Sequence, residues 1–188
     1  EKGHISLTEL EKTLREDTVM VSIMTVNNEM GAVEDIHAIG ELIKKKNPNC
    51  LFHTDAIQAY GKMILHPKKD FVDLLSVSGH KLHGPKGIGF LFIDEKVKIN
   101  PIIFGGGQQG GLRSGTLNIP GIAGMGLAAK MVYQDFPKKI EKLYELKDYF
   151  IEELEKLPEV KVNSEKGRAS APQIISASFY GVKAEVLL

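Results

Sequence analysis

Three short apolar runs, each followed by a polar loop, constrain the fold of this 188-residue chain more than any other feature. The first spans residues 18–26, and a segment with helical periodicity, 35–46, separates it from the second run at 50–54. The third run spans 73–78. Strands joined through a helix need a crossover connection, which makes them parallel and the connection right-handed. The pattern therefore predicts an α/β fold with a mostly parallel sheet and flanking helices.

The other elements follow from local signals. The run 18–26 is apolar on both faces, which is typical of a parallel strand buried within a sheet. The run 88–93 follows the third strand too closely for a crossover, so we expect it to pair antiparallel with that strand. Ser6 caps a short helix over residues 6–14, and Glu9 completes the capping-box pattern.

The second half of the chain begins with the stretch 104–116, which is too rich in glycine for regular structure. A helix is expected from 118 to about 136, and a second from 138 to 157. The second helix carries an apolar stripe opposite a face of Glu and Lys. The stripe consists of Ile140, Leu143, Leu146, Phe150, Leu154 and Leu157.

The break at Phe136 and Pro137 is the predicted domain boundary. It divides residues 1–136 from residues 137–188. Strands expected at 160–162 and 174–179 make the second part the start of a smaller α+β domain. The chain also opens without a methionine and closes inside a helical pattern, so we expect an internal fragment of a longer protein.

Composition excludes several functional classes. Lys and Arg number 24, as do Asp and Glu, so the charge gives no reason to expect nucleic acid or an anionic membrane as a partner. Cys50 is the only cysteine, which rules out an intramolecular disulfide and fits a reducing compartment. No apolar run is long enough to span a membrane. These features predict a soluble, cytoplasmic protein.

Polar side chains follow each of the three predicted parallel strands, at the edge where ligands bind in open α/β sheets. They are Asn27 and Asn28 after the first strand, Asp55 and Gln58 after the second, and Ser78, His80 and Lys81 after the third. An amine, a carboxylate and hydroxyl groups in one cluster suit pyridoxal 5'-phosphate. Lys81 is then the catalytic lysine, because its amine can form a Schiff base with the cofactor aldehyde.

The remaining polar residues have expected roles around this cofactor. Asp55 would pair with the pyridine nitrogen and keep it protonated, which sets the electron-withdrawing strength of the ring. Ser78, His80 and backbone amides near Gly79 can donate to phosphate oxygens. Gln58 and Asn28 are placed to bind the ring hydroxyl or the carboxylate of a substrate.

Each of these residues also has an ordinary structural interpretation. Asp55 alone could be a helix N-cap, Lys81 a solvated loop residue, and Asn27 and Asn28 the residues of a turn. His53 is better explained as a packed strand histidine than as a ligand. The other histidines considered have no convincing metal-ligand spacing and are expected at the surface. They are His4, His37, His66 and His83.

Two glycine-containing loops have compositions that could suit an anion site. The turn 84–87, Gly-Pro-Lys-Gly, lacks the Gly-Lys-Ser/Thr ending of a nucleoside-triphosphate loop, which excludes that function. The stretch 105–111 could be a flexible linker. Arg113 to Thr116, directly after it, instead argues for a bound anion.

Four motifs, in order along the whole chain, resemble those of the cysteine desulfurases. These are class V members of the fold-type-I pyridoxal-phosphate enzymes, of the NifS/IscS kind. The motifs are Val26-Asn-Asn-Glu-Met-Gly31, His53-Thr-Asp-Ala-Ile-Gln58, Ser76 to Gly89, and Gly105-Gly-Gly-Gln with Arg113-Ser-Gly-Thr116.

The resemblance implies that residues 1–136 are part of the cofactor-binding large domain of this fold and that 137–188 begin the C-terminal small domain. It implies Lys81 as the Schiff-base lysine, and as cofactor ligands Asn28, Asp55, Gln58, Ser78, His80 and Thr116. Thr116 would reach the cofactor phosphate of the neighbouring subunit in a homodimer. The implied substrate is L-cysteine, whose sulfur passes through an enzyme persulfide to an acceptor such as an iron–sulfur scaffold or a tRNA-thiolation protein.

This sequence also departs from the family pattern. The family's nucleophilic cysteine lies on a loop beyond Leu188, and Cys50 does not match it, so we expect a structural role for Cys50 and no turnover by these 188 residues alone. Gln109 and Gly110 stand where Glu-Arg is common. Three readings stay open: a desulfurase, another class V enzyme such as a selenocysteine lyase or an aminotransferase, and a non-catalytic module.

Overall fold

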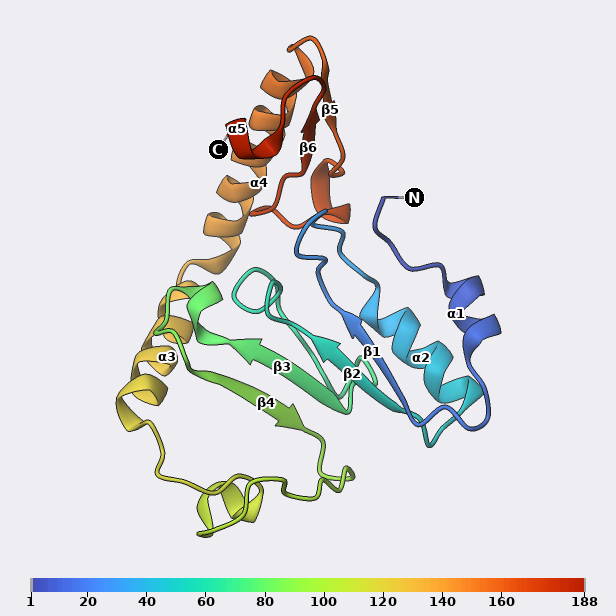
Figure 1. The fold of residues 1–188 in the computed structure, drawn as a ribbon, viewed down its shortest axis with the longest axis vertical. Coiled ribbons are helices and arrows are strands. Elements are labelled where there is room, and N and C mark those ends of the chain that lie inside the picture. Colours follow the sequence, from blue (N-terminus) through green and yellow to red (C-terminus); the bar gives the residue numbers. More distant parts are fainter. Residues whose placement is uncertain (1, 188) are drawn as a thin grey trace.

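A four-stranded mixed sheet forms the centre of the computed structural model, which describes residues 2–187. Strands β1 (Met20–Met24), β2 (Leu51–Asp55) and β3 (Leu74–Ser78) are parallel, and β4 (Gly89–Ile93) runs antiparallel to β3. The spatial order is β1-β2-β3-β4 (Figure 1). The predicted α/β fold, its parallel strands and the antiparallel fourth strand are confirmed.

Two helices flank the first strands. Helix α1 (Leu7–Thr13) is capped by Ser6, whose hydroxyl accepts the Glu9 amide at 3.3 Å, as the sequence predicted. Helix α2 (Ile36–Lys46) provides the crossover from β1 to β2 and buries Ile39 and Ile43 in the core. The core side of the sheet is formed by alternate residues such as Phe52, Leu75 and Val77. This alternation follows from the period of two along a strand.

The expectation that the first strand is buried on both faces is wrong for the described part of the chain. β1 lies at the edge of the sheet, and Met20 and Val19 are 51% and 76% exposed. Apolar composition does not distinguish a central strand from an edge strand, because that depends on which other strands pair with it.

Helix α3 (Ile119–Val132) begins at the predicted Asn118 cap but ends four residues before 136. Helix α4 (Phe136–Glu155) follows, and strands β5 (Val160–Val162) and β6 (Ala177–Phe179) form an antiparallel pair. The last helix is α5 (Ala184–Leu187). Three short 3₁₀ helices complete the fold: η1 (Gly79–Leu82), η2 (Gln108–Gly111) and η3 (Gly167–Ala169). None of the helices within residues 2–187 combines the length and apolar character that a bilayer crossing requires.

The predicted stripe on α4 is correct only in part. Ile140 and Leu154 are buried, but Leu146, Phe150 and Leu157 are each about half exposed. The buried face consists instead of Ile140, Tyr144, Lys147, Ile151 and Leu154. The helix has apolar residues on two faces, and its contact with β5 determines which face is covered.

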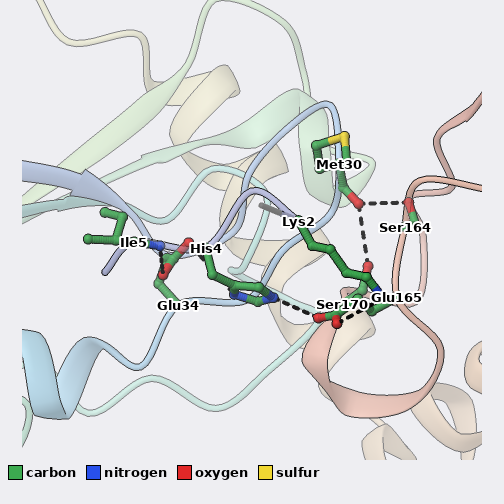
Figure 2. Close-up of polar contacts among 8 residues, drawn as sticks. All are labelled: Lys2, His4, Ile5, Met30, Glu34, Ser164, Glu165 and Ser170. Carbon is green, nitrogen blue, oxygen red and sulfur yellow. Dashed lines mark hydrogen bonds and ion pairs between the residues drawn. The ribbon is translucent and has the colours of Figure 1, made fainter. Parts of the chain in front are cut away.

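The C-terminal part of the chain docks on the loop that follows β1 through backbone pairing. The Val33 amide donates to the Ala169 carbonyl at 3.0 Å, and the Ala171 amide donates to the Gly31 carbonyl at 2.8 Å. Side chains extend this contact, since Ser164 Oγ donates to the Met30 carbonyl at 2.7 Å (Figure 2). The loop 26–34 is therefore held between the main sheet and the C-terminal part.

Candidate active site

The carboxyl ends of β1, β2 and β3 lie side by side at one edge of the sheet (Figure 1). Met24 of β1 pairs with Asp55 of β2, and Asp55 pairs with Ser76 of β3. β3 continues to Ser78 and leads into η1, which contains Lys81. The topology thus brings the polar residues that follow three separate strands to one edge, as the sequence predicted.

Close backbone packing fixes the turn that carries Lys81. The Gly79 amide donates to the Ile88 carbonyl at 2.8 Å, and a Cβ at Gly79 would lie 3.0 Å from the Ile88 side chain. A Cβ at Gly89 would lie only 2.4 Å from the Val77 carbonyl oxygen. Because glycine alone fits at these contacts, the Gly-Pro-Lys-Gly turn can fold back against the end of β3. The Gly79 amide itself is engaged in this turn, so the expected phosphate donors are the other backbone amides near Gly79.

Lys81 lies in η1 with its side chain exposed. Its carbonyl accepts a hydrogen bond from Lys62 Nζ at 3.2 Å. Burial lowers the pKa of Lys62, which is only partly exposed. Sequence reasoning missed Lys62, because no local pattern shows that residue 62 approaches residue 81.

Asp55 is half-buried at the end of β2. Its Oδ1 accepts the Ile57 amide at 2.8 Å, which fixes the orientation of the carboxylate in an Asx turn. Among the described residues, the hydrogen bonds to this carboxylate engage only Oδ1. The second oxygen can thus accept a hydrogen bond from a protonated ring nitrogen.

Ser78 and His80 form a pair, with 2.7 Å between Ser78 Oγ and His80 Nδ1. Ser78 is half-buried and His80 is exposed. Because this bond uses either the hydroxyl hydrogen or the Nδ1 hydrogen, the pair with a neutral ring has one donor left for an oxyanion, either His80 Nε2 or Ser78 Oγ. A phosphate oxygen can accept a hydrogen bond from this donor.

The loop residues have unequal roles. Asn27 Oδ1 accepts the amides of Glu29 and Met30 at 2.9 and 2.8 Å, so Asn27 is the turn residue and the exposed Asn28 is available for other contacts. Gln58 is half-buried, and its carbonyl accepts Gln173 Nε2 at 2.8 Å. Gln173, from the C-terminal part of the chain, is a second residue that sequence reasoning missed.

Thr116 does not follow any of these three strands. It is exposed in the segment between β4 and α3, and Figure 1 shows that segment apart from the carboxyl ends of β1, β2 and β3. The same segment contains three consecutive residues with positive φ, Gln109 to Gly111. This geometry agrees with the predicted irregular loop, apart from the short turn η2.

The other histidines and Cys50 are structural or surface groups. His4, His37, His66 and His83 are exposed, as expected. Cys50 is buried, and burial raises the pKa of its thiol against the opposing effect of Lys44. Within residues 2–187, no three His, Cys, Asp or Glu side chains gather in a way that could hold a metal ion.

Comparisons with known proteins place the chain in a family. The model of the class-V aminotransferases matches residues 1–188, so the chain belongs to the class-V aminotransferase family. It is 42% identical over 190 residues to the cysteine desulfurase IscS of Clostridium botulinum, covering 100% of this chain and 47% of that protein. The chain thus spans about half the length of this relative.

Solved structures agree with this assignment. A NifS-like protein superposes with a TM-score of 0.94 at 38% identity, over 99% of this chain and 50% of that one. The structure of SspA in complex with cysteine matches 69% of this chain and 37% of its own, with a TM-score of 0.65 and 40% identity. The fold-type-I architecture expected from the motifs is confirmed.

Proposed function

We propose that the full-length protein carrying these residues is a pyridoxal-phosphate-dependent cysteine desulfurase. The observation that carries the proposal is the arrangement of Lys81, Asp55 and the Ser78–His80 pair at one edge of three adjacent parallel strands. The similarity to cysteine desulfurases over the whole chain supports the choice of reaction.

Lys81 would hold the cofactor through its amine, which solvent and ligand can reach because the side chain is exposed. Asp55 would accept a hydrogen bond from the protonated ring nitrogen on Oδ2, because Oδ1 already accepts the Ile57 amide. When bound, the cofactor supplies an electron-withdrawing ring that weakens bonds at the substrate Cα. The carboxylate keeps that ring protonated.

Three further contacts complete the proposed cofactor site. The Ser78–His80 pair would donate to the phosphate group, and Gln58 and Asn28 would orient the ring hydroxyl or the substrate carboxylate. Thr116 would contact the cofactor of a second copy in a homodimer, which its separation from the other residues favours. The division into a large domain, 1–136, and the start of a small domain, 137–188, belongs to the same proposal.

Sulfur transfer needs a reactive thiolate, which Cys50 is poorly suited to supply. Its thiol is buried and its pKa is raised, whereas reactive cysteines are exposed and have lowered pKa values. We therefore assign the persulfide to a different cysteine of the full-length protein. That cysteine would pass sulfur from L-cysteine to an iron–sulfur scaffold or tRNA-thiolation protein in the cytoplasm.

Absorbance and product analysis test the proposal. The full-length protein should turn yellow with pyridoxal phosphate and convert L-cysteine to alanine with sulfur on the enzyme. Lys81→Ala should lose the colour and the product, whereas Lys86→Ala, which changes an exposed lysine of the neighbouring turn, should keep the colour. A wild-type protein that stays colourless would contradict the proposal. Release of selenide from selenocysteine without sulfide from cysteine would favour a selenocysteine lyase.

A further inference from the structure

Gln173 contains a buried polar atom that the fold leaves unpaired. Among the side chains of residues 2–187, its Oε1 is the one buried nitrogen or oxygen atom without a hydrogen-bond partner. Its Nε2 donates to the Gln58 carbonyl at 2.8 Å, and because a carbonyl only accepts, the orientation of the amide is fixed. A buried acceptor without a donor costs more than one neutral hydrogen bond contributes. An apolar residue of similar length would therefore suit the stability of the fold better, and glutamine at this position calls for another explanation.

Docking of the C-terminal part does not supply that explanation. Two backbone hydrogen bonds and the Ser164 hydroxyl already join this part to the loop 26–34. Ser164 is also fully paired, because it accepts the Ser176 amide at 2.8 Å while it donates to the Met30 carbonyl. Within residues 164–174, Gln173 alone forms a hydrogen bond with the turn that follows β2. Its contact is thus distinct from those that dock the C-terminal part on the loop after β1.

Gln58 lies in the turn after β2, three residues beyond Asp55, and is half-buried. Among the described residues no backbone amide donates to its carbonyl, so Gln173 is what holds this peptide unit in place. A rotation of the peptide unit would move the backbone of Gln58 and, with it, the side chain that we place at the cofactor ring hydroxyl. A ligand contact tolerates a displacement of only about 0.5 Å. The bond from Gln173 therefore bears on how well Gln58 reaches the ring.

We propose that Gln173 is a positioning residue, which holds the Gln58 carbonyl and so keeps the Gln58 side chain within reach of a bound pyridoxal cofactor. Cofactor binding and the docking of residues 170–174 should then strengthen each other, because the coupling between two sites is reciprocal. The inference rests on the proposed function, since it takes Gln58 as a ligand of the cofactor.

The test uses the full-length protein, as wild type and as three variants. Gln173→Met removes both polar atoms at nearly unchanged length, and Gln173→Asn keeps the amide on a shorter side chain. Ser164→Ala is the matched control, because it removes a side-chain bond from the C-terminal part to a backbone carbonyl outside the turn after β2. The readouts are the dissociation constant of pyridoxal phosphate from its visible absorbance, the thermal midpoint of the apoprotein, and hydrogen exchange in residues 170–174 with and without cofactor.

Gln173→Met should raise the cofactor dissociation constant about tenfold, the scale of one hydrogen bond. It should not lower the thermal midpoint of the apoprotein, because the unpaired acceptor is lost together with the bond. The cofactor should slow exchange in residues 170–174 of the wild type but not of this variant. Gln173→Asn should have an intermediate dissociation constant. Ser164→Ala should lower the thermal midpoint and change the dissociation constant by less than about twofold.

Two results would overturn the inference. One is an unchanged dissociation constant in Gln173→Met. The other is an equal increase of this constant in Gln173→Met and Ser164→Ala, which would mark a general effect of docking. A wild-type protein without a visible band would instead contradict the proposed function.

Discussion

Lys147 is the largest charged side chain in the interior of the described residues. It lies on α4, is 2% exposed, and donates to the Ala171 carbonyl at 3.0 Å. Burial lowers its pKa to about 8, and Asp148 and Glu165 offset part of this effect. Its position makes it a link between α4 and the segment that docks on the loop after β1.

Replacing this lysine by a methionine should stabilise the protein at neutral pH. Below pH 8 Lys147 is charged in both the folded and the unfolded state, so the folded state bears the full cost of removing the ammonium group from water. Between pH 8 and 10.5 only the folded state is neutral, so wild-type stability should rise with pH. Lys147→Met should raise the free energy of unfolding by about 1–2 kcal/mol at pH 7, a net value that includes the loss of the hydrogen bond to Ala171. Its stability should not rise with pH as that of the wild type does.

Urea unfolding at pH 7 and 9.5 measures both effects. Lys139→Met is the matched control, because Lys139 also donates from α4 to a backbone carbonyl, that of Met131, but is exposed. The control should change stability by less than about 0.5 kcal/mol at both pH values. A loss of stability in Lys147→Met at pH 7 would show that the bond to Ala171 outweighs the desolvation cost.

At the scale of elements, Asp73 joins α2 to the amino ends of β2 and β3. Its Oδ2 accepts Lys44 Nζ at 2.5 Å and the Phe52 amide at 2.7 Å. Lys44 also donates to the Cys50 carbonyl at 2.7 Å. One carboxylate therefore holds the helix and the neighbouring strand in register at the edge opposite the proposed site.

We expect Asp73→Ala to cost about 2–4 kcal/mol, because it leaves the ammonium of Lys44 and the Phe52 amide without their acceptor. Asp73→Asn should cost less, because the amide oxygen can still accept from Phe52. Chemical denaturation with circular dichroism measures the difference. Asp17→Ala, at an exposed ion pair with Arg15, should change stability by less than about 0.5 kcal/mol. Equal losses of stability in Asp73→Ala and Asp17→Ala would contradict the structural role of Asp73.

At the scale of the whole molecule, the N-terminal segment contacts the C-terminal part through Glu165 (Figure 2). Glu165 pairs with His4 Nε2 at 2.8 Å and with Lys2 at 3.4 Å. The same N-terminal segment is also bound to Glu34, whose carboxylate accepts a hydrogen bond from the Ile5 amide at 3.1 Å. The hydrogen bond from His4, followed by that from Lys2, lowers the pKa of Glu165.

This contact should weaken in acid. A carboxylate with a lowered folded-state pKa stabilises the fold above its unfolded pKa, and the contribution is lost as the pH falls through the folded value. Glu165→Gln should therefore raise hydrogen exchange in residues 2–5 at pH 7. It should also remove the further rise in exchange that the wild type shows as the pH falls below 4.5, the ordinary pKa of a glutamate carboxyl. Glu152→Gln, on the exposed face of α4, should leave this exchange unchanged. Equal exchange in both variants would show that Glu165 does not hold the segment.

The 188-residue segment in isolation should also self-associate. Ile102 and Phe104 are 89% and 80% exposed, and large apolar side chains at this exposure favour contacts between molecules. Sedimentation of the 188-residue segment should show oligomers, and the double variant Ile102→Ser with Phe104→Ser should shift the distribution toward monomer. A sharp monomer peak for the unmodified segment would contradict this prediction.

The sequence by itself determined which segments are helices and strands and which polar residues follow them. The caps at Ser6 and Asn118, the parallel runs and the turn before β4 are all set by residues near one another in the chain, whose hydrogen bonds and periodicity are local. Crossover topology then carries Asp55 and Lys81 to one edge, because the carboxyl ends of parallel strands meet there.

Only the tertiary structure decided the buried face of α4, the edge position of β1, and the contacts of Lys62 and Gln173 with the candidate site. The physical reason is that these contacts join residues far apart in sequence, such as Gln173 and Gln58. Their energies depend on how whole elements pack, and neither residue type nor local periodicity encodes that choice.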